Sequence, residues 1–340
     1  MKTNRNKRLL WQIPFLILLI VGTILIIRQQ QSTPYQKCAG TIFGTTYHIT
    51  YQYDDDLQPE LEAKMKEVDS ALSMFNKESI ISLINKNQPV TPNAMFVEVF
   101  QLAQEISKDT KGAFDITVAP LVNAWGFGFK HEQMPDKNAV DSLKSIIGYQ
   151  KVSYDGQHIR KSDPRIMLDC SAIAKGYGVD VVANLLKEKG ISNYMVEIGG
   201  EVVTHGISEK RIPWKIGVTK PTDDPLTEGN ELQTVLNLTD KAMATSGNYR
   251  NFYYKGKRKY AHTINPKTGY PVQHNILSAT VLTNRCVRAD AYATAFMVMG
   301  FEGAKNVLER NPDLMAYIIY DDNGQTKVWF SPSLKDKIEK

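Results

Sequence analysis

A run of 19 mostly apolar, uncharged residues near the N-terminus constrains this chain more than any other feature. The run covers Leu9 to Ile27, and as a helix it is about long enough to cross a lipid bilayer. Four basic residues precede it and no acidic residue does. The positive-inside rule therefore predicts a cytoplasmic N-terminus and an exported domain. We expect residues 1–28 to form a signal anchor with a single transmembrane helix.

Two other roles for the N-terminus stay open. A secreted protein would carry a similar segment and lose it by cleavage, although Arg28 and three glutamines follow the run in place of small residues. Cys38 admits a lipid-anchored form, but the residues before it, 35–37, are polar. Residues 29–39 are largely polar and include Pro34, which predicts a tether between the anchor and the domain.

The rest of the chain is electrically neutral. Of the 41 basic residues, five lie at or before Arg28, which leaves 36 basic residues against 36 acidic ones. A neutral domain lacks the positive surface that nucleic-acid binding uses. With 42% hydrophobic residues, about 300 residues suit one large globular domain. The three cysteines (Cys38, Cys170 and Cys286) show no metal-type spacing; we interpret them as small buried hydrophobes, and a disulfide remains possible.

Hydrophobic periodicity predicts helices and strands in mixed order. Helical spacing occurs over 57–72, 99–106, 140–147, 173–189, 289–299 and 302–310. Strands are expected at 41–53, 166–168, 194–198, 214–219, 232–238 and 277–283, with hairpins at 149–160, 249–264 and 315–330. This order predicts one α+β domain over residues 40–331 and a short C-terminal tail at 332–340.

Two segments carry residues suited to a metal and to a phosphate. Asp290 and Thr294 lie four apart at the start of an apolar helix, so they share one face, and their oxygens suit Mg²⁺. A helix cap would also explain Asp290. In the second segment, Asp169 to Gly178, an acid ends a strand and a helix opens with Lys175. This pattern suits an anionic ligand, and an N-capped, closely packed helix is the alternative.

Two further segments indicate a base and an aromatic slot. His262 lies three residues before a strong turn signal at 265–269, where it could act as a general base, although a lone histidine is more often a plain surface or core residue. Residues 112–128 interleave small residues with Phe114, Trp125 and Phe127. They could line a slot for a flat ring or form ordinary core beside a glycine loop.

Together these segments resemble the ApbE family, the FAD:protein FMN transferases, over about residues 40–330. The matching pieces occur in the family's order at 40–45, 72–75, 112–115, 169–178, 198–200, 244–247, 262–271 and 289–294. The resemblance implies a T-fold-like α+β domain with FAD in a cleft. It implies Mg²⁺-dependent transfer of the FMN half of FAD to a threonine or serine hydroxyl of an exported electron-transfer protein, with release of AMP. The implied location is the bacterial inner membrane, with the catalytic domain on the periplasmic side.

The resemblance also implies site residues. Metal ligands fall on the side chains of Asp290 and Thr294 and on the Ala172 carbonyl, and His262 is the candidate base. Flavin contacts fall on Phe43, Phe75, Ala113, Phe114, Asp115, Asp169, Lys175, His262 and Ile264. Many family members have methionine at position 43 and tyrosine at position 75, so this chain lacks a hydroxyl at Phe75. An FAD pyrophosphatase, in which water replaces the protein hydroxyl, and a non-catalytic flavin-binding protein remain alternatives.

Overall fold

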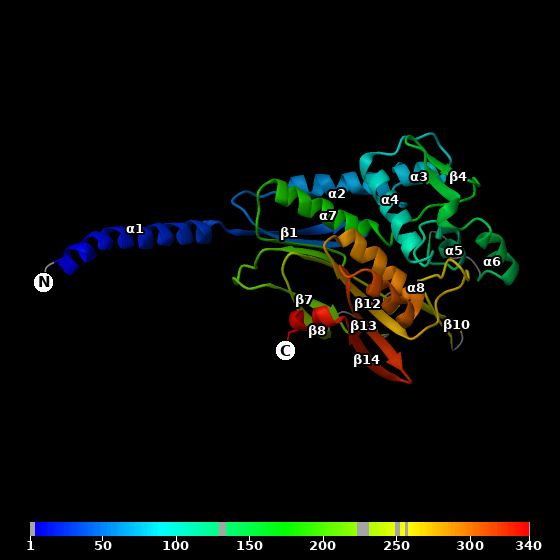
Figure 1. The fold of residues 1–340 in the computed structure, drawn as a ribbon. Coiled ribbons are helices and arrows are strands. Elements are labelled where there is room, and N and C mark those ends of the chain that lie inside the picture. Colours follow the sequence, from blue (N-terminus) through cyan, green and yellow to red (C-terminus); the bar gives the residue numbers. More distant parts are fainter. Residues whose placement is uncertain (1–3, 129–133, 223–230, 249–251, 256–257, 340) are drawn as a thin grey trace.

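The N-terminal apolar run forms α1 (Asn4–Ser32), a helix that projects from the rest of the chain (Figure 1). The structure is a computed structural model that describes residues 4–128, 134–222, 231–248, 252–255 and 258–339. Within α1 the window Gln12–Gln29 has a mean hydropathy of 1.9, and the protein buries none of it. By length and composition alone, α1 is a candidate membrane span.

The centre of the domain is one eight-stranded sheet in which every neighbouring pair is antiparallel. Along the sheet the order is β1-β2-β5-β6-β9-β12-β13-β14. These strands are β1 (Tyr35–Ile42), β2 (Thr45–Gln52), β5 (Tyr194–Ile198), β6 (Glu201–His205), β9 (Lys241–Gly247), β12 (Ile276–Thr283), β13 (Met315–Asp322) and β14 (Gln325–Phe330). Three of the connections are tight hairpins, and the longer ones carry the helices and the smaller hairpins.

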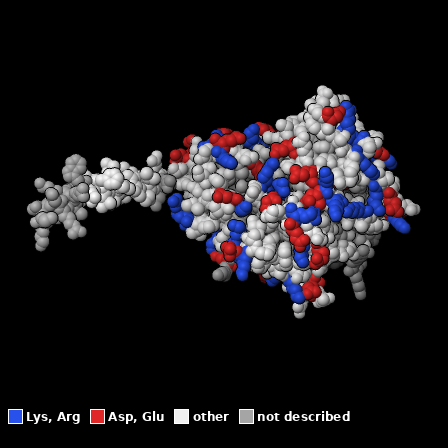
Figure 2. Space-filling model, viewed as in Figure 1, with Lys and Arg blue, Asp and Glu red and all other residues white. Residues whose placement is uncertain are grey.

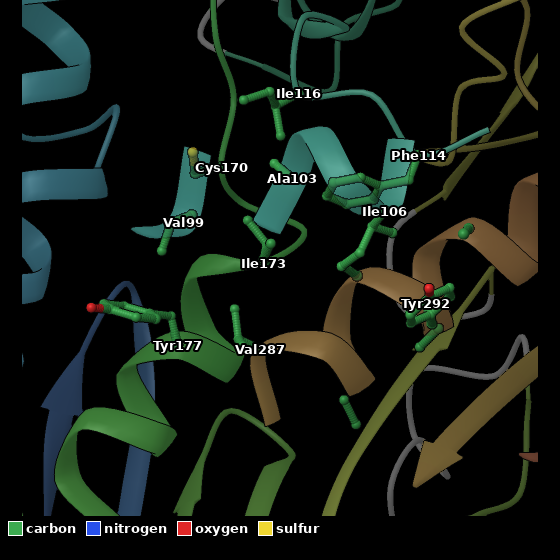
Figure 3. Packing of buried hydrophobic residues seen from close by; sticks show 14 of the residues in the cluster. Val99, Ala103, Ile106, Phe114, Ile116, Cys170, Ile173, Tyr177, Val287 and Tyr292 are labelled. Atoms are coloured by element: carbon green, nitrogen blue, oxygen red, sulfur yellow. The ribbon is translucent and has the colours of Figure 1, made fainter. Parts of the chain in front are cut away.

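Helices cover one face of this sheet. The helices α7 (Ala174–Glu188) and α8 (Cys286–Arg310) lie directly on it, and α2 (Gln58–Leu72) and α4 (Ala94–Asp109) pack against them from outside (Figure 1). Figure 3 shows the core where α4, α7 and α8 meet, with Val99, Tyr177 and Val287 contributed by one helix each. Toward the end remote from α1 lie α3 (Ile80–Asn85), α5 (Ala119–Ala124), α6 (Lys137–Lys144), η1 (Tyr149–Lys151), β3 (Val152–Tyr154) and β4 (Ile159–Lys161).

The opposite face of the sheet is covered by the hairpin of β7 (Trp214–Thr219) and β8 (Leu232–Leu238) and by η2 (Pro332–Lys337). The expected C-terminal tail at 332–340 is therefore wrong. Leu334 is fully buried, and the Glu339 N–H donates to the Val235 carbonyl at 2.9 Å. Residues 332–339 are therefore part of the hydrophobic core on this face of the sheet, because their apolar side chains pack together with the β7–β8 hairpin.

The expected tether at 29–39 is also wrong. The helix α1 continues to Ser32, and β1 begins at Tyr35 and pairs with β2 along its whole length. Only 7% of Cys38 is exposed, and its place inside β1 argues against a lipid anchor there. The polar appearance of this segment reflects an edge strand, whose outward side chains are polar while alternate ones pack inward.

Two predicted strands differ from expectation. The single strand at 41–53 is the β1–β2 hairpin, which turns at Phe43 and Gly44 with φ of 53° and 73°. The segment 166–168 has no regular secondary structure and joins no sheet: the Leu168 N–H and carbonyl bond to the Asn85 side chain at 2.7 and 2.9 Å. The side chains of this segment are apolar because they are buried. Its backbone needs no neighbouring strand, because the Asn85 amide satisfies the hydrogen bonds of Leu168.

The remaining predicted helices and strands occur close to their expected positions, and the α+β class is confirmed. The two helices expected at 289–299 and 302–310 are the halves of α8, which is kinked at Gly300 (φ 75°). The expected hairpin at 249–264 is β10 (Phe252–Lys255) and β11 (Arg258–Ala261), with residues 249–251 and 256–257 outside the described part. Figure 2 shows basic and acidic side chains intermixed over the domain on the face in view, as its neutral charge predicts.

Candidate functional site

The first part of the site is the crossing of α7 and α8, where the segments predicted to bind a phosphate and a metal meet. The Gly176 N–H donates a hydrogen bond to Asp290 Oδ2 at 3.0 Å. A Cβ atom on Gly176 would lie 2.4 Å from the Cys286 carbonyl oxygen. Because only glycine permits this approach, the small-residue start of α7 brings Asp290 to the first turn of that helix.

Three oxygen atoms at this crossing accept no hydrogen bond from the part of the chain that the structure describes. In a continuous helix the Gly176 N–H would bond to the Ala172 carbonyl, but here it is taken by Asp290. The other two atoms are Asp290 Oδ1 and the hydroxyl of Thr294, which lies half-buried one turn further along the same face of α8. Carboxylate, hydroxyl and carbonyl oxygens are the ligands that Mg²⁺ prefers, so the predicted set fits a hard cation.

Asp290 is the one carboxylate in this oxygen set. Among the described residues there is no group of three or more His, Cys, Asp or Glu side chains suited to a metal ion. A cation held at the crossing would therefore depend on the hydroxyl of Thr294 and the carbonyl of Ala172 as well as on Asp290. Burial raises the pKa of Asp290, while the Lys175 ammonium and the Gly176 N–H act in the opposite direction.

Lys175 brings a positive charge to the same crossing. Its Nζ lies 2.5 Å from Glu201 Oε1, and Glu201 is 2% exposed. Burial by itself would lower the pKa of Lys175, but the carboxylates of Glu201 and Asp290 raise it, so the amine is protonated. Burial raises the pKa of Glu201 to about 7, against the lowering effect of Lys175. Glu201 is not among the residues predicted from the sequence, where its only signal is an acid directly after the Gly199–Gly200 turn.

Asp180 is a second residue that the sequence analysis missed. Its carboxylate accepts hydrogen bonds from the backbone N–H groups of Cys286 and Val287 at 2.8 and 3.1 Å. It therefore caps the N-terminus of α8 from the neighbouring helix α7. Asp180 is 7% exposed, and burial raises its pKa to about 6. This cap fixes the start of the helix that carries Asp290.

The turn between β1 and β2 borders the crossing. Phe43 has a left-handed backbone conformation that is unusual for a bulky residue, and its ring packs against Gly178, where a Cβ atom would lie 2.6 Å from the ring. A Cβ on Gly199 would lie 2.8 Å from Thr45 and 3.3 Å from Lys175. Four segments of the family resemblance, 40–45, 169–178, 198–200 and 289–294, therefore converge at one place.

The second part of the site is formed by the aromatic loop at 112–128 and the turn that follows His262. Trp125 Nε1 donates to the Gly269 carbonyl at 2.8 Å. The Trp125 ring stacks on Tyr260 with 5.9 Å between centroids and contacts Tyr270 at 5.6 Å. His262 is half-buried, and its ring meets Phe127 edge-on at 6.5 Å. Trp125 is only 5% exposed and packs in a hydrophobic cluster, so the half-buried rings of Phe127 and Tyr260 are the ones near the candidate base that a ligand could reach.

Several predicted flavin contacts lie inside the protein. Ala113, Phe114 and Ile264 are 6%, 2% and 5% exposed, and the latter two belong to hydrophobic clusters. Figure 3 shows the Phe114 ring directed into the core. Phe114 and Ile264 therefore use their side chains for packing, which leaves their backbone for a ligand.

The two predicted acids in this region organise loops. The Asp115 carboxylate accepts hydrogen bonds from the N–H and hydroxyl of Thr117 at 2.8 and 2.7 Å, and from the Tyr149 N–H at 2.8 Å. The Asp169 N–H donates to the Ile116 carbonyl at 2.6 Å, which ties the aromatic loop to the start of α7. Burial raises the pKa of both carboxyl groups.

Phe75 differs from the other predicted flavin contacts because its side chain is 74% exposed. Its neighbour Met74 packs against the main core. An aromatic ring held outward beside a packed neighbour offers apolar surface to a ligand or a partner.

Comparison with known proteins gives consistent matches over most of the chain. Residues 43–319 match the sequence profile of the ApbE family. Relatives named FAD:protein FMN transferase occur in Vibrio cholerae (36% identical, 89% of this chain and 92% of the relative) and in Haemophilus influenzae (36% identical, 87% and 89%). Among solved structures, the flavin transferase ApbE from Vibrio cholerae has a TM-score of 0.80 at 35% identity, covering 89% of this chain and 100% of that one. The Pseudomonas stutzeri flavinyl transferase ApbE has a TM-score of 0.80 at 30% identity, covering 89% and 96%.

Proposed function

We propose the following reaction for this chain, which belongs to the ApbE family and is a flavin transferase. The FMN half of FAD is transferred to a threonine or serine hydroxyl of an acceptor protein, and AMP is released. The observation that carries the proposal is the α7–α8 crossing, where three oxygen ligands without hydrogen-bond donors in the described chain lie beside the protonated Lys175.

The cation that the family implies suits these oxygens. Mg²⁺ would be held by Asp290, by the Thr294 hydroxyl and by the Ala172 carbonyl. When bound, it would offset the negative charge of the FAD pyrophosphate. Lys175 supplies a second positive charge from the neighbouring turn of α7, and this charge is held in place before any ligand arrives.

We assign the role of general base to His262. A neutral imidazole accepts the proton of the acceptor hydroxyl as its oxygen attacks the phosphorus of the FMN phosphate. A new oxygen–phosphorus bond forms, the bond from that phosphorus to the bridging oxygen breaks, and AMP leaves with the bridging oxygen. The half-buried rings of Tyr260 and Phe127 near His262 suit the flat flavin ring, and the buried Trp125 ring packs against Tyr260. The T-fold-like arrangement that the resemblance implies belongs to the same proposal.

We place the enzyme at the bacterial inner membrane, with α1 as its anchor and the domain on the periplasmic side. The apolar window Gln12–Gln29 and the four basic residues that precede the apolar run support this orientation. The acceptors would then be exported electron-transfer proteins that carry a serine or threonine flavinylation site.

Product analysis tests the reaction. Protein, FAD, Mg²⁺ and an acceptor protein are incubated together, and the products are separated by chromatography and mass spectrometry. The proposal predicts AMP together with an acceptor whose mass increases by one FMN phosphoester. AMP with free FMN would identify a pyrophosphatase, and unchanged FAD would identify a binding protein. Omitting Mg²⁺ and substituting Asp290→Asn are the matched controls.

A further inference from the structure

We infer that Glu201 is a positioning residue, which holds the ammonium of Lys175 away from Asp290 and so keeps the Asp290 carboxylate free for a divalent cation. The inference rests on the metal site of the proposed function. It adds a role for a buried acid that the reaction described above does not use.

The geometry separates two charges that would otherwise pair. Lys175 Nζ lies 2.5 Å from Glu201 Oε1, and no ion pair within the described residues joins Lys175 to Asp290. Yet the next residue, Gly176, bonds directly to Asp290, and the negative charge of Asp290 acts on Lys175. The ammonium is therefore near the metal-binding carboxylate but is directed to another one.

Glu201 is not explained by its contribution to stability. It is the first residue of β6 and is 2% exposed, and its Oε2 is buried without a hydrogen-bond partner among the described residues. Leaving a buried carboxylate oxygen unsatisfied costs free energy. The only side chain that pairs with Glu201 in the described part of the chain is Lys175. A function in controlling Lys175 accounts for retaining a costly acid at this position.

The charge balance shows what its removal would do. Lys175, Glu201 and Asp290 together carry one net negative charge when all are ionised. Without Glu201, the buried Asp290 becomes the nearest counter-ion of the partly exposed Lys175 ammonium, and opposite charges attract more strongly beside a buried carboxylate than in bulk water. A divalent cation would then have to displace Lys175 from Asp290 before it could bind. Removing the ammonium as well should lift that competition.

Binding of Mn²⁺ to the full-length protein in detergent micelles, without FAD, tests this competition. Free Mn²⁺ is measured by electron paramagnetic resonance at pH 8. Glu201→Gln should weaken Mn²⁺ binding by roughly tenfold, within the range of coupling between contacting charges. The double substitution Glu201→Gln with Lys175→Met should restore binding to within about threefold of wild type. Lys175→Met alone should bind Mn²⁺ at least as tightly as wild type.

Two results would overturn the inference while leaving the metal site intact. One is unchanged Mn²⁺ affinity in Glu201→Gln. The other is a double variant as weak as Glu201→Gln, which would make Glu201 itself a ligand. If wild type binds Mn²⁺ no better than Asp290→Asn, the metal site and this inference are both wrong. The transfer assay described above then tests the flavin reaction independently. Glu201→Asp, which keeps the charge, should bind Mn²⁺ more tightly than Glu201→Gln and serves if the glutamine variant does not fold.

Discussion

Gly176→Ala is expected to slow flavin transfer by about a hundredfold while the protein stays folded. The new Cβ would lie 2.4 Å from the Cys286 carbonyl oxygen and 2.8 Å from Asp290 Cβ, whereas ordinary contacts begin at 3.4 Å. The helices α7 and α8 must therefore separate by about 1 Å at their crossing. This displacement stretches the 3.0 Å hydrogen bond from Gly176 to Asp290 and moves the carboxylate that we propose as a metal ligand away from Ala172.

Stability and activity should respond by different amounts. Overpacking a closely packed contact costs about 1–3 kcal/mol, and alanine returns about 0.5–1 kcal/mol because glycine is a poor helix former. The net loss in free energy of unfolding is then about 0–2.5 kcal/mol, within the range of an ordinary substitution. A displacement of about 1 Å in a group that positions the reaction costs about a hundredfold in rate. The rate loss therefore exceeds what partial unfolding could produce.

The assay compares transfer rates at saturating FAD and Mg²⁺ with urea unfolding of the same preparations. Gly156→Ala is the matched control, because Gly156 in the β3–β4 turn has φ 97° and nothing within 4 Å of a new Cβ. It should lose about 1–2 kcal/mol through backbone strain and keep the wild-type transfer rate. A Gly176→Ala enzyme that transfers FMN at the wild-type rate would refute the idea that this close approach positions Asp290.

Four other outcomes are expected. Asp290→Asn should remove most of the transfer activity, because an amide is a poorer Mg²⁺ ligand; near-normal activity with unchanged Mg²⁺ dependence would exclude this role. His262→Ala should lower single-turnover transfer by roughly a hundredfold or more while FAD still binds by fluorescence, and a normal rate at saturating FAD would exclude the base. Burial raises the pKa of Asp180 to about 6, so the folded protein binds the proton of this carboxyl group more tightly than the unfolded chain does. The stability that the protonated Asp180 contributes should therefore be lost as the pH rises from about 4 through 6. Urea unfolding at stepped pH should show a smaller fall in Asp180→Asn. A reporter fused after Lys340 should be active only in an exported form, unless a soluble protein beginning near Gln29 is released.

Elements with a strong period could be predicted from sequence, and elements held by distant partners could not. The helices α2 and α7 show apolar residues every three or four positions, and their buried faces follow that spacing. The strand β9 escaped prediction because its sequence KAMATSG has only one β-branched residue, Thr245, and no aromatic residue. It is a strand because β6 and β12 lie on either side of it. Tertiary pairing decided its structure where local preference did not.

The candidate site shows the same division. The pattern of Asp290 and Thr294 was visible because both lie on one helix face. The bond between Asp290 and Gly176 joins residues 114 positions apart, and it depends on how closely two helices cross. Phe114 shows what the sequence does not reveal: the family resemblance assigns it to flavin, and its ring is packed in the core, so only its backbone is left for that role. Sequence indicates which residue types are present, but burial decides which of them can reach a ligand.

The junction between α1 and β1 would fix the distance between the candidate site and a bilayer if α1 spans one. Only Thr33 and Pro34 separate the two elements, and both carbonyls are held at 3.0 Å, by the Gln52 side chain and the Tyr53 N–H. From this junction β1 runs about 23 Å, at about 3.3 Å per residue, to the turn beside the site. If α1 lies in a bilayer, this short, hydrogen-bonded junction and the length of β1 would hold the candidate site at a set distance from the bilayer. An acceptor protein would then have to present its hydroxyl group at that distance from the bilayer, so the reach of the acceptor would decide whether it receives a flavin.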